Sequence, residues 1–229
     1  MPFWIVLPLL TLIYGLALTF LAGRITPLSS QGQALQRKVF HVGIFTGAVP
    51  AQLSFGFWGV VLYGMTVSSL VFLSLPRGSQ SSLYRILDRS GKGEGRAGIL
   101  LPLLSTALGG ILTVLLVGEF AVVGYLACGW GDAAGEIVGL RFGRHSLPSL
   151  PPGSRTSSKT LEGSVAVLLL AGLGSWAALA LLGFEPFPAA GAGLVSGAVA
   201  AVAEALSWKR TDNLWVQLLP AVVAWWLLG

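Results

Sequence analysis

The sequence predicts an all-α integral membrane protein, a polytopic bundle of about eight transmembrane helices, with seven as the alternative count. Hydrophobic residues make up 54% of the 229 residues and charged residues only 10%, whereas soluble domains carry roughly 25% charged residues. The apolar residues are also grouped into segments close to the ~20 residues that a helix needs to cross a bilayer. We therefore expect a single transmembrane domain over residues 1–229, without a separate soluble domain.

Eight segments are apolar enough to be spans. The first lacks the basic start of a signal peptide, so we expect a retained helix. The single cysteine, Cys128, excludes a disulfide framework and a multi-cysteine zinc site. The predicted spans are residues 3–22, 39–54, 57–75, 98–117, 120–139, 161–183, 189–207 and 214–228.

The fourteen lysines and arginines all fall in alternate loops, near residues 23–38, 76–97, 140–160 and 208–213. The intervening loops contain none. The positive-inside rule places the basic loops in the cytoplasm and both termini outside. The net charge of +5 is then explained by topology, and we expect no nucleic-acid partner. The expected location is a bacterial cell membrane.

Four ionisable side chains fall inside the predicted spans: His41, Asp132, Glu136 and Glu204. On insertion scales each costs at least ~2.5 kcal/mol, so such residues usually have a function. By their distance from the span ends, all four lie in the cytoplasmic half. The sequence therefore predicts a site that opens to the cytosol at the lipid boundary.

Asp132 and Glu136 are four residues apart, so their carboxylates share a helix face and repel each other unless a cation intervenes or one is protonated. Magnesium held by Asp132, Glu136 and Glu204 and completed by substrate phosphates would resolve this conflict. Alternatively, one carboxylate pairs with Arg141 or Arg144 and the other is neutral. Small-residue ridges beside the carboxylates allow close helix packing and predict that spans 120–139 and 189–207 bring them together.

Two cytoplasmic loops are candidates for binding an anion. The glycine-rich loop 91–96 carries two cations but lacks the Walker spacing, and lipid head groups are an equally good partner for it. The loop after Arg141 ends at Lys159, where a helix begins and free amides favour phosphate. We predict a nucleotide contact at Lys159, with a purely topogenic role for these charges as the alternative.

Several short blocks follow one another along the chain: Arg37-Lys38-Val39-Phe40-His41, residues 131–139 with Arg141-Phe142-Gly143-Arg144, Lys159-Thr160-Leu161-Glu162-Gly163-Ser164, Glu204-Ala205-Leu206-Ser207 and Asp212-Asn213-Leu214. Taken together in this order, they resemble the CTP-dependent lipid kinases, a family that includes dolichol kinase, phytol kinase and a CTP-using diacylglycerol kinase. The resemblance covers residues 37 to about 220. It implies that the terminal phosphate of CTP is transferred, with magnesium, to a membrane-embedded alcohol.

The same resemblance implies roles for individual residues. Asp132 would be catalytic or metal-binding and would accept the proton of the alcohol, with His41 as the alternative base. Lys159 would be catalytic and would bind the nucleotide. The other expected nucleotide contacts are Arg37, Lys38, His41, Arg141, Arg144, Glu162, Asp212 and Asn213.

The short chain resembles the phytol kinases more than the longer dolichol kinases. This favours an isoprenoid alcohol of the phytol, geranylgeraniol or farnesol type as substrate, with dolichol and a homodimer left open. A CTP-dependent diacylglycerol kinase and a CDP-lipid-forming cytidylyltransferase are alternatives. A small-molecule transporter is the non-enzymatic alternative, but the chain has no convincing internal repeat and its charges cluster on one side.

Overall fold

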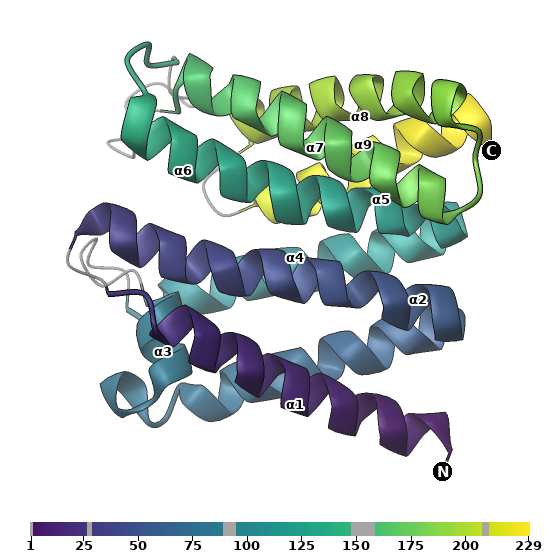
Figure 1. Cartoon of the computed structure of the whole chain (residues 1–229). Helices are drawn as coiled ribbons and strands as arrows, with labels where there is room; N and C mark the ends of the chain where they lie inside the picture. Colours follow the sequence, from purple (N-terminus) through teal and green to yellow (C-terminus); the bar gives the residue numbers. More distant parts are fainter. Residues whose placement is uncertain (1, 27–28, 89–94, 148–158, 208–210) are drawn as a thin grey trace. The chain divides into compact units, whose positions relative to one another are not determined.

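The computed structural model describes residues 2–26, 29–88, 95–147, 159–207 and 211–229. Apart from one isolated β-bridge, all regular secondary structure in these residues is helical (Figure 1). Five of the described helical stretches are long and apolar enough to cross a membrane. The protein is therefore an all-α polytopic membrane protein, as predicted. The chain divides into two compact units, Met1–Leu104 and Ser105–Gly229, and their union in one transmembrane domain stays a prediction.

The first unit is helical and has its own apolar core. The core contains Leu18 and Ala22 of the first helix, Phe40 and Val71 of the long second helix, and Ile86 of the short helix Ser82–Leu87. The helices are α1 (Phe3–Gly23), α2 (Ser30–Ser74), η1 (Gly78–Gln80), α3 (Ser82–Leu87) and the first part of α4 (Ala97–Val117).

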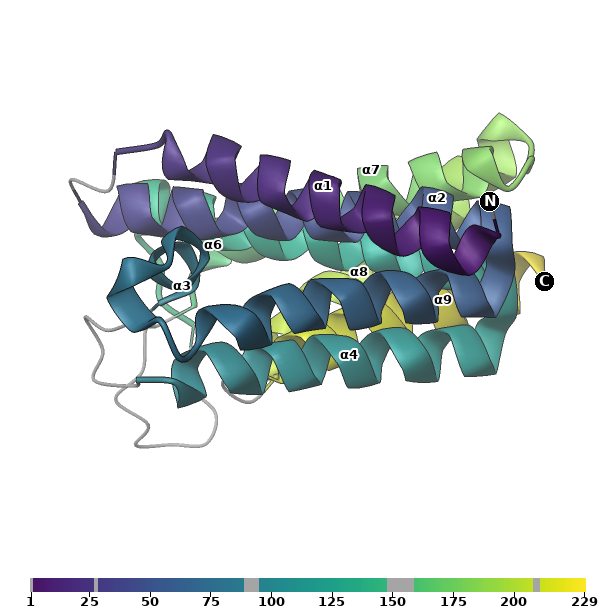
Figure 2. The ribbon, with the colours of Figure 1, turned by 90° about the horizontal axis from the view of Figure 1, so that it is seen from below.

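Helix α2 is a hairpin of two helical arms. Gly56 interrupts the helix with φ 59° and ψ −144°, a conformation that costs glycine little because it has no Cβ. Tyr63 Oη donates to Ile44 O at 2.8 Å, which joins one arm to the other, and the two arms can be followed in Figure 2. The predicted break between spans 39–54 and 57–75 is therefore confirmed.

Two of the predicted cytoplasmic loops are shorter than expected. Ser29 accepts a hydrogen bond from Gly32 N at 3.2 Å, which is an N-cap, so α2 begins at Ser30 and much of the predicted loop 23–38 is helical. The loop predicted over 76–97 contains η1 and α3, because Leu83 and Ile86 pack into the core of the unit. The sequence reasoning missed both because these segments are too polar or too short to look like spans.

The second unit contains the remainder of α4 and the helices that carry most of the predicted site. Predicted span 120–139 is a continuous run of η3, α5, η4 and α6, and α6 continues to Phe142, which shortens the predicted loop 140–160. The elements are η3 (Gly118–Phe120), α5 (Ala121–Leu126), η4 (Ala127–Asp132), α6 (Ala133–Phe142), α7 (Leu161–Leu181), α8 (Pro186–Leu206) and α9 (Asp212–Leu228).

Helix α7 lies alongside both α6 and α8 (Figure 1), and glycines set these close approaches. A Cβ added at Gly135 would lie 2.6 Å from a methyl of Val167, and one at Gly197 would lie 2.7 Å from the Cα of Gly172. The small-residue ridges therefore allow close packing, as expected. Both ridges face α7, however, whereas the sequence reasoning had paired the helices that carry them.

Large apolar side chains cover the outside of the helices. Phe187 is 91% exposed and Trp226 is 78% exposed, and many leucines are more than half exposed. Hydrocarbon lipid chains can contact such a surface, whereas water would oppose its exposure. The outer faces of the helices are thus suited to a bilayer.

Candidate active site

Asp132 is positioned by a π-helical turn. It is the last residue of η4 (Ala127–Asp132), it is only 8% exposed, and helical dihedral angles continue from it into α6. Single π turns within α-helices are rare and frequently occur at functional sites. Glu136 follows in the first turn of α6 and is partly buried. The four-residue spacing is helical as predicted, but no pattern in the sequence indicates the π turn.

Lys159 is held at the start of α7. Thr160 is the N-cap of this helix, and its side chain accepts a hydrogen bond from Gly163 N at 3.2 Å. Lys159 Nζ lies 3.0 Å from Glu204 Oε1 and also donates to the backbone oxygen of Glu204. Because Glu204 is in the last turn of α8, this pair ties the beginning of one helix to the end of another.

Glu204 lies among charges from three other segments. It interacts electrostatically with Lys159, and with the carboxylates of Asp132 and Asp212. We call Asp132, Lys159, Glu204 and Asp212 the polar cluster. The structure thus brings together four of the predicted site residues, all of which belong to the second unit.

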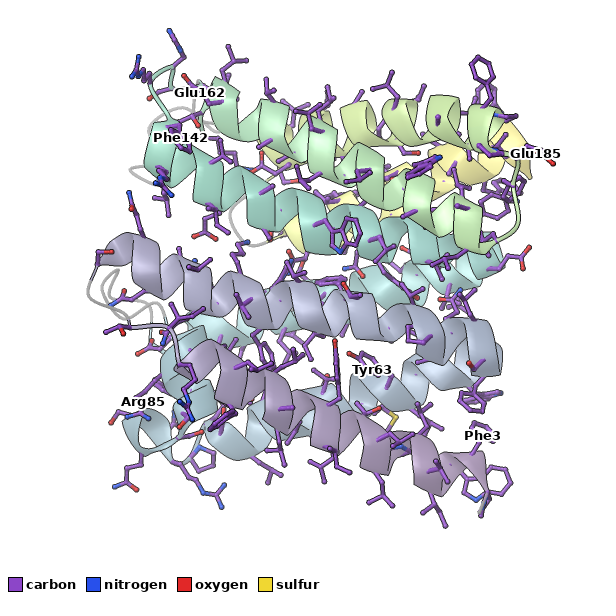
Figure 3. All side chains as sticks on the ribbon, viewed as in Figure 1. Phe3, Tyr63, Arg85, Phe142, Glu162 and Glu185 are labelled. Carbon is purple, nitrogen blue, oxygen red and sulfur yellow. The ribbon has the colours of Figure 1, made fainter. Side chains whose placement is uncertain are left out.

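His145, just after α6, and Glu162, in the first turn of α7, form a side-chain pair. His145 Nδ1 lies 2.8 Å from Glu162 Oε1, and the backbone N of His145 donates to the same carboxylate at 3.3 Å. Leu147 N donates to Lys159 O at 2.7 Å, and Leu161 N donates to His145 O at 2.9 Å. These two backbone hydrogen bonds form the isolated β-bridge. This clamp fixes the residues next to Lys159. Glu162 lies at one end of α7 and Glu185 lies at the start of α8, beyond the far end of α7 (Figure 3).

His145 is a residue of this region that the sequence reasoning missed. It lies outside the predicted spans, so it raised no question of burial, and it is strongly exposed. The sequence feature that points to His145 is its place in the predicted loop 140–160, which leads into the block that contains Glu162. Sequence separation alone does not show that their side chains meet.

A phytol kinase of Synechocystis sp. is 30% identical to this chain over an alignment of 229 residues, which covers 98% of this chain and 92% of that protein. The chain belongs to the lipid and polyprenol kinase family. No protein-family model and no solved structure matches the chain. The predicted resemblance is thereby confirmed at the level of a lipid or polyprenol kinase.

For a polyprenol kinase, the polar cluster combines the charges that phosphoryl transfer uses. A buried carboxylate can accept a proton, and a lysine can neutralise phosphate oxygens. Arg141 and Arg144 lie just before the clamp and are exposed, with the guanidinium of Arg141 5.3 Å from the ring centroid of Phe142. Their predicted contacts with a nucleotide, like that of Glu162, stay predictions.

Asn213 is built into the helix packing of this kinase. It is buried, its amide Nδ2 donates to Thr106 Oγ1 at 2.7 Å, and Cys128 Sγ lies 3.8 Å from its Oδ1. The neighbouring Asp212 accepts from Asn213 N at 3.1 Å and belongs to the polar cluster. Asp212 therefore belongs to the polar cluster, whereas the side chain of Asn213 is used in helix packing.

The basic block of the kinase lies in the first unit. Arg37, Lys38 and His41 are on the first arm of α2, not in a loop as predicted for Arg37 and Lys38. Lys38 is buried, and the ring of His41 packs against Phe45 with centroids 4.6 Å apart. The contact of this block with a nucleotide stays a prediction.

No group of three or more His, Cys, Asp or Glu side chains in the described part of the chain is arranged to hold a metal ion. The carboxylates of Asp132 and Glu204 interact electrostatically, and Glu204 also forms an ion pair with Lys159. Magnesium in phosphoryl-transfer sites is usually held by one or two carboxylates and by substrate phosphates. Asp132 and Glu204 fit that pattern, and the predicted trio with Glu136 stays a prediction.

Proposed function

We propose that this protein transfers the terminal phosphate of CTP to the hydroxyl of an isoprenoid alcohol, with magnesium as cofactor. The similarity to a phytol kinase supports the class of acceptor. The resemblance of the sequence blocks to the CTP-dependent lipid kinases supports the donor. The observation that carries the proposal is the polar cluster, in which Lys159 and Glu204 form an ion pair and Asp132 is buried.

In the proposed reaction, the alcohol oxygen attacks the terminal phosphorus of CTP. The bond between that phosphorus and its bridging oxygen breaks, and CDP leaves. The proton of the alcohol passes to a carboxylate, for which Asp132 is our candidate because it is the most buried acid of the cluster. The products are CDP and a lipid monophosphate.

Lys159 has a positioning and charge-neutralising role in this proposal. Its side chain is 29% exposed, so an incoming phosphate could reach it. The phosphate would replace the Glu204 carboxylate as a partner of the ammonium, which has three donors and can keep its bond to the backbone oxygen of Glu204. That exchange would leave the Glu204 carboxylate available for the cofactor.

Asp132 and Glu204 would hold magnesium together with the phosphates. The ion supplies charge stabilisation to the phosphate oxygens when it is bound. The contribution of the chain is to keep two carboxylates near each other, at the end of α8 and the beginning of α6. Glu136 is the third candidate ligand.

The test is a product analysis with purified protein in nanodiscs. CTP carrying ³²P in its terminal phosphate is incubated with phytol, geranylgeraniol, farnesol, undecaprenol, dolichol or diacylglycerol. The proposal expects a labelled isoprenoid monophosphate and CDP, lost when magnesium is chelated, and a weaker signal with ATP or GTP. Pyrophosphate and a CDP-lipid would identify a cytidylyltransferase instead, and labelled phosphatidic acid would identify a diacylglycerol kinase.

A further inference from the structure

An apolar groove runs between α8 and α9 within the second unit. Its volume is about 760 Å³, in the range of small-molecule binding sites. Among the residues that the structure describes, those that line the groove carry no charge. The principal lining residues are Val195, Val199, Val202 and Leu206 of α8 and Trp215 and Leu219 of α9.

The groove is open to the outer surface of the helices. Val202 is 58% exposed and Trp215 is 43% exposed, whereas Ala203 on its floor is buried. A bound molecule would therefore be held on one side by protein and touched on the other by lipid chains. This geometry suits a ligand that enters from the bilayer and not from water.

One end of the groove is polar. Ser207 and Thr211 line it there, next to the last turn of α8 and the start of α9. Asp212 follows Thr211 as the first residue of α9, and Glu204 lies in the last turn of α8, so this end of the groove is at the same helix ends as two members of the polar cluster. Glu204 itself is seven residues from Gly197, and therefore lies on the helix face that packs against α7.

The length of the groove matches one leaflet of a bilayer. From Val195 to Leu206 a helix rises about 16 Å, at ~1.5 Å per residue. The hydrocarbon core is ~30 Å thick, so a chain that starts at the polar end would reach about the midplane. The groove thus fits a single hydrocarbon chain with a polar head at one end.

We propose that the α8–α9 groove binds the isoprenoid chain of the acceptor alcohol, with the hydroxyl at the end lined by Ser207 and Thr211. This inference rests on the proposed function for the identity of its ligand. The branched chain fills the space among Val199, Val202 and Trp215. Its hydroxyl is then at the same helix ends as Asp212 and Glu204.

The first test is photo-crosslinking in nanodiscs with a geranylgeraniol analogue that carries a diazirine at its hydrocarbon end and an alkyne tag. We expect labelled peptides from residues 195–206 and 215–219, and competition by unlabelled geranylgeraniol but not by phosphatidylglycerol. Equal competition by phosphatidylglycerol would mean that ordinary bilayer lipid occupies the groove and would overturn the proposal. Labelling confined to other helices would overturn it as well.

The second test fills the groove. Val199→Trp adds bulk at a lining position, and Leu194→Trp adds the same bulk on the same helix at a position that is 61% exposed and outside the lining. We expect Val199→Trp to reduce labelling and raise the KM for geranylgeraniol about five- to tenfold, an amount typical of losing a few apolar contacts. The KM for CTP stays the same, and Leu194→Trp behaves as wild type. Unchanged labelling in a folded Val199→Trp protein contradicts the proposal.

The two proposals fail in different ways. Labelling outside the groove, with alcohol phosphorylation intact, removes the groove and keeps the function. Competable labelling inside the groove, with no phosphate transfer to any alcohol, keeps a lipid-binding groove and removes the kinase reaction proposed above.

Discussion

Lys159 Nζ lies 3.0 Å from Glu204 Oε1 and joins two residues that are 45 positions apart in the chain. The pair connects the residue just before the N-cap of α7 to the last turn of α8. Both members are partly buried, so neither charge is fully hydrated. A residue that would meet a nucleotide phosphate is therefore already held in place by an acid that the phosphate can replace.

Removing the lysine should weaken use of the nucleotide. We expect Lys159→Ala to raise the KM for CTP about ten- to hundredfold, because hydrogen bonds to charged groups contribute ~1.5–3 kcal/mol. Lys159→Arg should recover only part of the lost affinity for CTP, since a planar guanidinium places its donors differently from an ammonium. Steady-state kinetics at saturating alcohol measures the effect.

The control for this prediction is the binding of the alcohol, followed by thermal shift or native mass spectrometry. Alcohol binding should be nearly unchanged because the lysine meets phosphate and not hydrocarbon. A parallel loss of alcohol affinity and CTP affinity would indicate that Lys159 serves the fold and not the nucleotide. Glu204→Gln separates the roles further, since it removes the ion pair while leaving the lysine in place.

Replacing the buried carboxylate should abolish turnover. We expect Asp132→Asn to lower kcat at least ~100-fold, the scale of a lost general base, with the melting temperature almost unchanged because the amide keeps the size of the side chain. The matched control is Glu185→Gln, an exposed carboxylate next to the opposite end of α8 from Glu204, which should keep wild-type activity. A residual Asp132→Asn rate above about a tenth of wild type, a loss below ~1.4 kcal/mol, would exclude Asp132 as the essential acid.

The N-cap of α7 should matter for nucleotide binding as well as for stability. Thr160→Ala removes the acceptor for Gly163 N, which typically costs ~1 kcal/mol of folding free energy. Fraying of this turn would also release Lys159, so we expect a higher KM for CTP with kcat less affected. Thr160→Ser keeps the acceptor and should restore both. Hydrogen exchange at the amide of Gly163 reports the fraying directly, and a normal exchange rate in Thr160→Ala would refute the explanation.

Much of the fold followed from the sequence because the spans are long and apolar and because Gly56 breaks a helix where the charge pattern required a turn. The π turn before Asp132 did not follow, since it depends on tertiary packing of η4 and leaves no periodicity. The pairing of Lys159 with Glu204 also did not follow, because local patterns do not determine which helix ends meet. Lys38 shows the limit of charge as a guide: it was predicted in a loop, yet it is buried in a helix.

Close packing of α7 and α8 should be needed to keep Lys159 and Glu204 together. A Cβ at Gly197 would lie 2.7 Å from the Cα of Gly172, so Gly197→Ala forces the helices apart and should cost ~1–3 kcal/mol. Gly191→Ala is the control, because nothing lies within 4 Å of a Cβ there and alanine favours the same helix. We expect Gly197→Ala to lower the melting temperature and raise the KM for CTP. Equal melting temperatures for the two variants would contradict the packing explanation.

We expect the second unit to cross the membrane in a single orientation. The basic residues in alternate loops predict that the end of the unit with His145 faces the cytoplasm and that the end with Glu185 faces outside. Both residues are exposed, and native Cys128 is fully buried, so new cysteines can be labelled against little background. In intact cells a membrane-impermeant maleimide should react with Glu185→Cys, whereas His145→Cys should react only after permeabilisation. The opposite pattern would invert the proposed orientation, and equal reactivity of both cysteines in intact cells would contradict a membrane-spanning unit with its nucleotide site in the cytoplasm.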